Sequence, residues 1–218
     1  MIDLHTHTIF SDGVLVPAEL ARRARVKGYE ALAFTDHVDL SNLEPVLARL
    51  VPACRKMAAE LGIILLPGVE LTHLPPALIG PAVVRARELG AKIIVVHGET
   101  LVEPVAGGTN RAALEAGADI LAHPGLITRE EAELAAAKGV FLEITTRPGH
   151  ALANGHVAAV ARAAGARLLL NNDAHAPADL VTPEMAEKIA LGAGLTPVEW
   201  RRAQAAAREL VEAGNAGE

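Results

Sequence analysis

Residues 92–99 read Lys-Ile-Ile-Val-Val-His-Gly-Glu, a short apolar run that ends in His97 and Glu99. Four consecutive β-branched residues are typical of a strand buried on both faces, as strands are in the parallel sheets of α/β proteins. In such folds the functional side chains gather at the carboxyl ends of the strands. This stretch therefore predicts a buried parallel strand and one edge of a functional site.

The same pattern continues through the rest of the chain. Buried parallel strands are predicted at residues 2–4, 31–35, 63–66, 92–96, 120–122, 140–144 and 167–170. Alanine and leucine recur at the spacing of amphipathic helices over residues 17–27, 43–61, 81–89, 129–138, 155–164, 182–191 and 197–213. This alternation predicts an α/β protein built from βα repeats, either an open doubly wound sheet or a closed barrel.

Nearly every predicted strand ends in a side chain that can bind a metal ion. These side chains are His5, His7, Asp36, His37, Glu70, His97, Glu99, His123, Glu143, Asp173 and His175. An open sheet would spread such positions along a line, whereas a barrel gathers them around one mouth. We therefore favour a barrel whose site lies at the carboxyl ends of its strands.

The ligand types indicate which ions such a site would bind. Imidazole and carboxylate without thiolate are typical of Zn, Mn or Fe at a catalytic centre. The candidate ligands exceed the roughly four to six positions around one ion. Two or three clustered divalent ions with one bridging carboxylate are therefore expected.

Composition narrows the function classes further. The formal net charge is −6 and aromatic residues make up 2% of the chain, so no long nucleic acid is expected as a partner.

The sequence shows no membrane span and no secretory signal pattern, which predicts a cytoplasmic protein without a membrane partner. Cys54 lies in a helical pattern and is expected to pack there. We expect one domain over residues 1–212 and a flexible tail over residues 213–218.

Short motifs occur in a fixed order along residues 5–175. They are His5-Thr6-His7, Ser11-Asp12-Gly13, Thr35-Asp36-His37, Gly68-Val69-Glu70, His97, Ala122-His123-Pro124-Gly125 and Asp173-Ala174-His175. This ordered set resembles the motifs of the PHP (polymerase and histidinol phosphatase) family of metal-dependent phosphoesterases. One His-x-His motif occurs in many hydrolase barrels, but the complete ordered set is specific. The resemblance implies a distorted seven-stranded (β/α) TIM-like barrel with a trinuclear metal centre.

The resemblance also implies three sets of ligands. One ion would be held by His5, His7, Glu70 and Asp173. Glu70 would bridge to a second ion held by His97 and His123. The third ion would be held by Asp12, His37 and His175, with Asp12 where some relatives have histidine.

The sequence is similar to family members that stand alone and resemble histidinol phosphatase. This similarity implies that the protein is a phosphoric monoester hydrolase with a small phosphorylated substrate. Histidinol phosphate is the first candidate, and a short nucleotide such as a 3′,5′-bisphosphate is another. Paired ions would lower the pKa of a shared water and supply hydroxide for attack on phosphorus. Glu70 and Asp173 are then expected in catalysis, Arg147 as a phosphate clamp and His73 as a candidate proton donor.

Other polar residues near the strand ends have several interpretations. Asp36 is predicted to support a neighbouring ligand rather than to bind metal. Substrate contact and an ordinary structural role both stay open for Glu99 and Glu143. Arg147, His150 and Asn154 are candidates for a substrate wall, with ordinary structural roles as the alternative. His156 begins a predicted helix and is expected on its surface.

Two other functions fit parts of the pattern. A metal-dependent amidohydrolase also begins with His-x-His and ends with an aspartate at a strand end, but it does not require the Ser11-Asp12-Gly13 and Asp173-x-His175 motifs. A PHP module retained as a metal-stabilised scaffold is the non-catalytic alternative. The sequence leaves the oligomeric state open.

Overall fold

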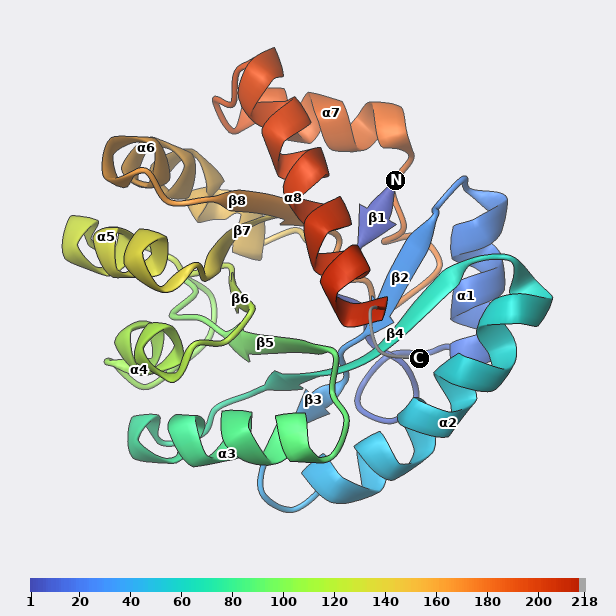
Figure 1. Cartoon of the computed structure of the whole chain (residues 1–218). Coiled ribbons are helices and arrows are strands. Elements are labelled where there is room, and N and C mark those ends of the chain that lie inside the picture. The colour runs from blue at the N-terminus through green and yellow to red at the C-terminus, as the bar shows by residue number, and fades with distance from the viewer. Residues whose placement is uncertain (216–218) are drawn as a thin grey trace.

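The computed structural model describes residues 1–215, which fold into a parallel α/β barrel (Figure 1). The sheet follows chain order through β1 (Ile2–Asp3), β2 (Ala31–Phe34), β4 (Ile64–Leu71), β5 (Ile93–His97), β6 (Ile120–Ala122), β7 (Phe141–Thr145) and β8 (Leu168–Asn171). The short strand β3 (His37–Val38) pairs with β4 just beyond the place where β2 pairs with it. Since β2 and β3 form one interrupted strand, the barrel has the seven strand positions that the sequence predicts.

The first and last strands meet near their carboxyl ends and nearly close the barrel. Thr6 forms a parallel bridge with Ala174, and the His7 amide donates to the Ala174 carbonyl at 2.9 Å. On the other side of this bridge, the Leu4 amide donates to the side-chain oxygen of Asn171 at 2.9 Å. At this junction of β1 and β8, the seam of the barrel, a side-chain oxygen thus takes the place of a backbone carbonyl as hydrogen-bond acceptor. The predicted distorted barrel is confirmed.

Side chains alternate across the barrel wall and form two apolar cores. Val95 and Phe141 face inward and belong to the inner core. Val96 and Leu142 face outward and pack beneath the helices. Because strand side chains repeat every two residues, Glu143 has the inward parity of Phe141 and enters the barrel at its carboxyl end.

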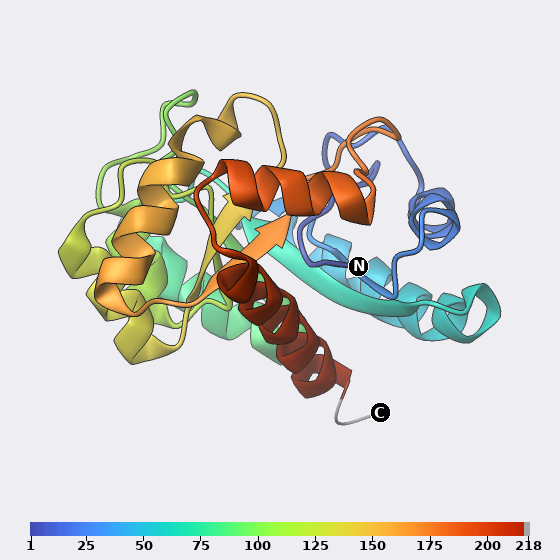
Figure 2. The ribbon, with the colours of Figure 1, turned by 90° about the horizontal axis from the view of Figure 1, so that it is seen from above.

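The last helix, α8 (Pro197–Asn215), closes the amino-terminal end of the barrel. Its residues Ala206, Ala207 and Val211 belong to the inner core. In Figure 1 this helix crosses the middle of the ring of helices, and in Figure 2 the yellow and orange strand arrows point away from it. The opposite end of the barrel, where the strands terminate, is therefore the end that can admit a ligand.

The other helices of residues 1–215 surround the sheet. They are α1 (Pro17–Val26), α2 (Leu43–Leu61), α3 (Pro76–Glu88), α4 (Thr109–Ala116), α5 (Arg129–Lys138), α6 (Asn154–Ala164) and α7 (Pro183–Gly192), with the 3-10 turn η1 (His150–Ala153). Helix α4 is missing from the sequence prediction because it is short and buries only two apolar side chains, Ala113 and Leu114. Helix α3 begins earlier than predicted, and Pro81, the predicted start, lies inside it.

Residues 213–215 of the predicted tail form the end of α8. A Cβ at Gly214 would lie 3.4 Å from the Leu66 side chain, so this turn packs against the base of the barrel. Residues 216–218 of the predicted tail lie outside the described residues. No helix within residues 1–215 has both the length and the apolar character needed to cross a membrane.

A buried polar network joins β1 to the end of β8. The Tyr29 hydroxyl donates to the Val181 carbonyl at 2.8 Å and accepts from the Asn172 amide at 2.6 Å. The same Asn172 amide donates to Asp3 Oδ2 at 2.7 Å. Asp3, Tyr29 and Asn172 are all fully buried. Their bonds hold the seam of the barrel just below the ends of its strands.

We expect Tyr29→Phe to lower the free energy of unfolding by about 1–3 kcal/mol. The substitution keeps the buried ring but leaves the Val181 carbonyl and one Asn172 N–H without a partner. Urea denaturation of metal-free protein measures the change, with an unchanged m-value showing that the unfolding transition is otherwise the same. Phe34→Leu is the control for altered ring packing without a polar loss, and equal stability of Tyr29→Phe and wild type would contradict this account.

Candidate metal centre

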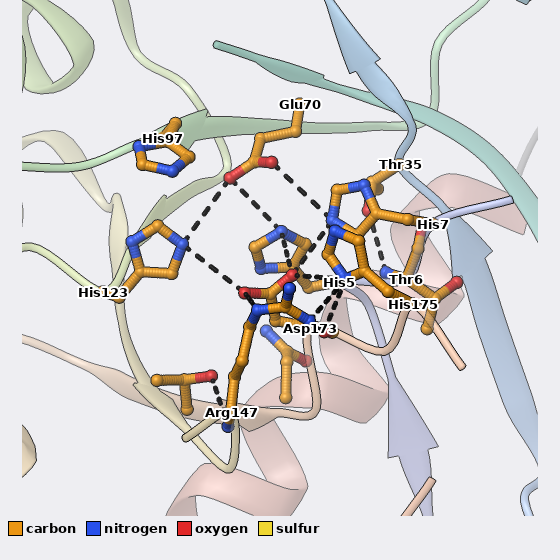
Figure 3. Close-up of polar contacts among 12 residues, drawn as sticks. His5, Thr6, His7, Thr35, Glu70, His97, His123, Arg147, Asp173 and His175 are labelled. Carbon is orange, nitrogen blue, oxygen red and sulfur yellow. Dashed lines mark hydrogen bonds and ion pairs between the residues drawn. The ribbon is translucent and has the colours of Figure 1, made fainter. Parts of the chain in front are cut away.

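Four side chains from the carboxyl ends of β1, β4 and β8 form the middle of the site (Figure 3). They are His5, His7, Glu70 and Asp173. His5 Nε2 lies 3.2 Å from Glu70 Oε1, and His7 Nε2 lies 3.1 Å from Asp173 Oδ1. Two longer distances cross between these pairs, 3.6 Å from His5 Nε2 to Asp173 Oδ1 and 3.7 Å from His7 Nε2 to Glu70 Oε2. All four residues are buried. The structure thus brings together the predicted ligands of the first ion.

His123 joins this group because the chain bends at the end of β6. Ala122 already faces the inner core, so an extended residue 123 would point toward the helices. His123 instead adopts a left-handed conformation with φ 27°, which is uncommon for a residue with a Cβ. Its Nε2 lies 3.8 Å from Glu70 Oε1 and 3.7 Å from Asp173 Oδ2. Asp173 has φ 52° at the end of β8, so two strands carry this local strain at the site.

Asp12, His37 and His175 form the more exposed side of the centre. Asp12 Oδ1 lies 3.1 Å from His175 Nε2 and 3.6 Å from His37 Nε2. The His7 ring stacks on that of His175 with 4.0 Å between centroids. The Asp12 side chain is 57% exposed, so this side of the centre opens to solvent.

Asp36 holds the loop that carries Asp12. Its carboxylate accepts from the Thr8 amide at 2.7 Å and from the Ser11 hydroxyl at 2.8 Å. A Cβ at Gly13 would lie 2.4 Å from the His7 carbonyl oxygen, so the loop can turn this closely only with glycine there. Asp36 therefore has the predicted supporting role, and it acts by holding the loop just before Asp12 rather than by bonding a ligand side chain.

Glu143 orients two ligands from inside the barrel. Its Oε1 accepts from His5 Nδ1 at 2.8 Å and from the Asn171 amide at 2.9 Å. Its Oε2 accepts from the backbone amide of His123 at 3.1 Å. In the neutral tautomer that donates its Nδ1 proton to Glu143, His5 has its Nε2 lone pair directed to the centre and available to a cation. Of the two roles left open for Glu143, the structure favours support of the ligands.

Among the described residues, the buried side-chain polar atoms without a hydrogen-bond partner all belong to this centre. They are His5 Nε2, His7 Nδ1, His7 Nε2, Glu70 Oε1, Glu70 Oε2, His123 Nδ1 and Asp173 Oδ1. Each such atom costs about 1–3 kcal/mol when it is left without a partner. Nitrogen and oxygen atoms that face one another without hydrogen-bond geometry are the arrangement expected around shared cations, so these residues fit divalent metal ions.

The charges of the centre are strongly interdependent. Burial alone would lower the pKa of His5, but Glu143, Glu70 and Asp173 raise it well above its usual value. Burial also raises the pKa of Asp173 well above its usual range, and the neighbouring carboxylates act in the same direction. Without metal the cluster therefore retains protons. An incoming cation must displace them, so metal affinity is expected to rise with pH.

The two predicted substrate residues lie at different depths. Arg147 Nη1 donates to the Asp173 carbonyl at 3.1 Å and lies 2.7 Å from His175 Nδ1, so this side chain borders the centre. His73 lies farther out, in the loop after β4, and its side chain is 42% exposed. Its Nε2 lies 3.3 Å from Glu103 Oε2. The structure thus places the Arg147 side chain beside the candidate metal ligands and His73 at the rim of the site.

Three residues whose roles the sequence left open make hydrogen bonds that hold parts of the fold together. Glu99 Oε1 accepts from the Asn110 amide at 2.9 Å and fixes the loop before α4. The Asn154 side chain exchanges two hydrogen bonds with the backbone of Thr145 and so ties the start of α6 to the end of β7. His156 bonds the Ile127 carbonyl at 2.8 Å, so it is tied to a neighbouring loop and is not simply a surface residue.

Sequence reasoning did not single out Glu103 and left the role of His150 open, although both lie beside the candidate ligands. Glu103 lies 3.2 Å from His97 Nε2, and the His150 ring stacks on His123 with 4.2 Å between centroids. Neither residue follows a strand directly. Their position depends on the paths of the loops after β5 and β7, which no motif in the sequence indicates.

Comparisons with known proteins agree with this fold. The PHP domain family model matches residues 3–97. An uncharacterized protein of Methanocaldococcus jannaschii is 50% identical over 199 residues, which are 90% of this chain and 91% of that protein. A chain in the cryo-EM structure of an archaeal ribonuclease P with mature tRNA has a TM-score of 0.74 at 17% identity, covering 99% of this chain and 91% of that chain.

A candidate histidinol phosphatase of Listeria monocytogenes has a TM-score of 0.58 at 12% identity, covering 85% of this chain and 99% of that chain. Together with the ordered motifs, these matches define the class of protein as a PHP-type α/β barrel with the fold of metal-dependent phosphoesterases and clustered candidate metal ligands. The family-model match over residues 3–97 supports a PHP family member, and the solved structures share its fold.

Proposed function

We propose that the protein is a metal-dependent phosphoesterase that hydrolyses a small phosphomonoester. The observation that carries this proposal is the group of buried, unpartnered nitrogen and oxygen atoms beside the guanidinium of Arg147. The unpartnered atoms suit divalent cations, and the guanidinium suits a phosphate that those cations would also bind. An amide substrate would have no need of such a fixed positive charge.

The ligand sets follow the three groups of side chains. His5, His7, Glu70 and Asp173 would hold one ion, His97 and His123 would hold a second ion with Glu70, and Asp12, His37 and His175 would hold a third. Bound Zn, Mn or Fe would lower the pKa of a water molecule and neutralise charge on the phosphoryl oxygens. Glu143 and Asp36 would keep these ligands in position through the bonds described above.

The remaining roles belong to groups nearer the solvent. Arg147 would hold a phosphate oxygen through its guanidinium, beside Asp173 and His175. His73 would donate a proton to the leaving oxygen from the rim of the site. The net charge of −6 disfavours a long polyanion and favours a small substrate.

The test is phosphate release from a panel of phosphomonoesters that includes histidinol phosphate, mononucleotides and a nucleoside 3′,5′-bisphosphate. Protein reconstituted with Zn, Mn or Fe is assayed, and the metal content of the same sample is measured. Phosphate release that requires metal supports the proposal, and the preferred ester identifies the substrate class. Ammonia release from amide substrates without phosphate release would favour the amidohydrolase, and no turnover of either kind would favour the scaffold.

Arg147→Ala is expected to raise KM for the phosphate ester by about 10- to 100-fold with a smaller change in kcat. The loss of one charge-assisted contact to phosphate, worth about 1.5–3 kcal/mol, sets this range. Steady-state kinetics measures the change, and equal metal content shows that the centre is intact. Arg129→Ala, which removes an exposed arginine paired with Glu133, is the matched control. An unchanged KM in Arg147→Ala would contradict the phosphate contact.

A further inference from the structure

A second group of histidines lies beside the centre, where β5 and β6 end. His97, His123 and His150 each offer a ligand nitrogen, and these atoms lie within 4.8 Å of one another. All three residues are buried. His123 Nδ1 has no hydrogen-bond partner. Three buried imidazoles at this separation form a potential ligand set, and one of them, His150, lies outside the family motifs.

His150 is held in the orientation that a metal ligand requires. It opens the turn η1 directly after Gly149, whose φ of 89° allows the chain to turn back toward the barrel. Its Nδ1 lies 2.7 Å from the buried Thr100 hydroxyl oxygen. Donation of the Nδ1 proton to Thr100 leaves the Nε2 lone pair free. That Nε2 atom faces Glu103, at 3.4 Å from Oε1.

Glu103 supplies the anionic group of this cluster. Its Oε2 lies 3.2 Å from His97 Nε2 and 3.3 Å from His73 Nε2, in addition to the contact of Oε1 with His150. His97 Nδ1 lies 3.2 Å from the Gly98 carbonyl and can donate to it, so its Nε2 is the atom left for a ligand. The carboxylate therefore reaches two buried imidazole nitrogens and one exposed nitrogen.

The loop that carries Glu103 is fixed at both of its ends. Glu99 accepts from the amides of Gly108 and Asn110, and the Asn110 side chain donates to the Pro124 carbonyl at 2.9 Å. A Cβ at Gly125 would lie 1.9 Å from the Glu99 carbonyl oxygen, which shows how closely the two loops pack. Glu103 is thus presented to the histidines by a braced loop.

We propose that His150 and Glu103 are metal ligands that complete, with His97 and His123, a divalent-ion position on the β5–β6 side of the centre. Glu70 lies within 4 Å of nitrogens of His5, His7, His37 and His123, whereas Glu103 is the carboxylate paired with His97. The second ion would then have its own carboxylate on this side. The assignment rests on the metal binding of the proposed function but not on hydrolysis.

The test measures metal binding directly. His150→Gln and Glu103→Gln are expected to retain one ion fewer per chain after dialysis, or to bind it at least about 10-fold more weakly. Elemental analysis gives the stoichiometry, and the visible spectrum of Co²⁺-loaded protein reports the lost coordination. The matched controls are His156→Gln and Glu115→Gln, in which a histidine and a glutamate outside the centre are changed, and both are expected to bind like the wild type.

Thr100 provides a second test that leaves every ligand in place. Thr100→Val removes the acceptor that orients His150 and is expected to weaken the same ion about 10-fold, whereas Thr100→Ser restores it. Wild-type stoichiometry, affinity and Co²⁺ spectrum in both His150→Gln and Glu103→Gln would overturn the assignment. Loss of an ion in these variants, together with no phosphate release by the wild type, would support the ligands and refute the proposed hydrolysis.

Discussion

Glu70→Gln is expected to lower kcat/KM for a phosphate ester by at least about 10³-fold while the barrel stays folded. Both carboxylate oxygens of Glu70 are buried without a hydrogen-bond partner, and they face imidazole nitrogens on several sides. Burial would raise the pKa of Glu70, but His5 and His37 hold it well below its usual value, so the group is an anion. An amide has nearly the same shape but neither the negative charge nor the second acceptor oxygen.

The measurement pairs kinetics with metal content, because loss of activity alone has many causes. Glu70→Gln is expected to lose at least one ion per chain, and circular dichroism checks that its secondary structure is unchanged. Glu130→Gln, an exposed glutamate of α5, is the control for the chemical change. Near wild-type turnover by Glu70→Gln with a full complement of metal would refute the bridging role of this residue.

The barrel and the middle of its site can be predicted from the sequence because both follow from the buried strands and from the residues at their carboxyl ends. Residues such as Glu70 and His97 follow or end apolar runs, and parallel strands bring such residues to one face. Single positions nevertheless depend on local backbone geometry. Side chains alternate along β6, so an extended His123 would point outward toward the helices. Only its left-handed conformation brings the ring into the site.

The rest of the site depends on contacts between loops far apart in the sequence. Glu143 is 138 residues from His5, and its role follows from the closure of the barrel rather than from any motif. Glu103 and His150 lie on loops after β5 and β7, where sequence periodicity gives no side-chain position. Helix α4, which begins after one of these loops, was missed because its short apolar face gives too weak a periodic signal.

Removal of metal is expected to lower the melting temperature by roughly 10 °C. A ligand that binds only the folded state at about 1,000 times its Kd stabilises it by about 4 kcal/mol, and each kcal/mol corresponds to about 2–4 °C in a chain of this length. The unpartnered atoms of His5, His7, Glu70 and Asp173 are the groups that lose their cation. Thermal unfolding of chelator-treated protein measures the effect, and re-addition of Zn, Mn or Fe is expected to reverse it.

The difference between metal-loaded and metal-free protein should widen as pH rises. The pKa of His5 is raised in the folded state, so the stability that its proton contributes is present below about pH 6.5 and is lost as pH rises through the folded-state value. The raised pKa of Asp173 acts in the same direction, because its ionised form is disfavoured in the metal-free site. Metal binding shows the opposite trend, since cations compete with protons for these ligands. Equal melting temperatures with and without metal between pH 6 and 8 would mean that the buried atoms do not bind cations, and Mg²⁺ restoring stability as well as Zn²⁺ would contradict an imidazole-rich centre.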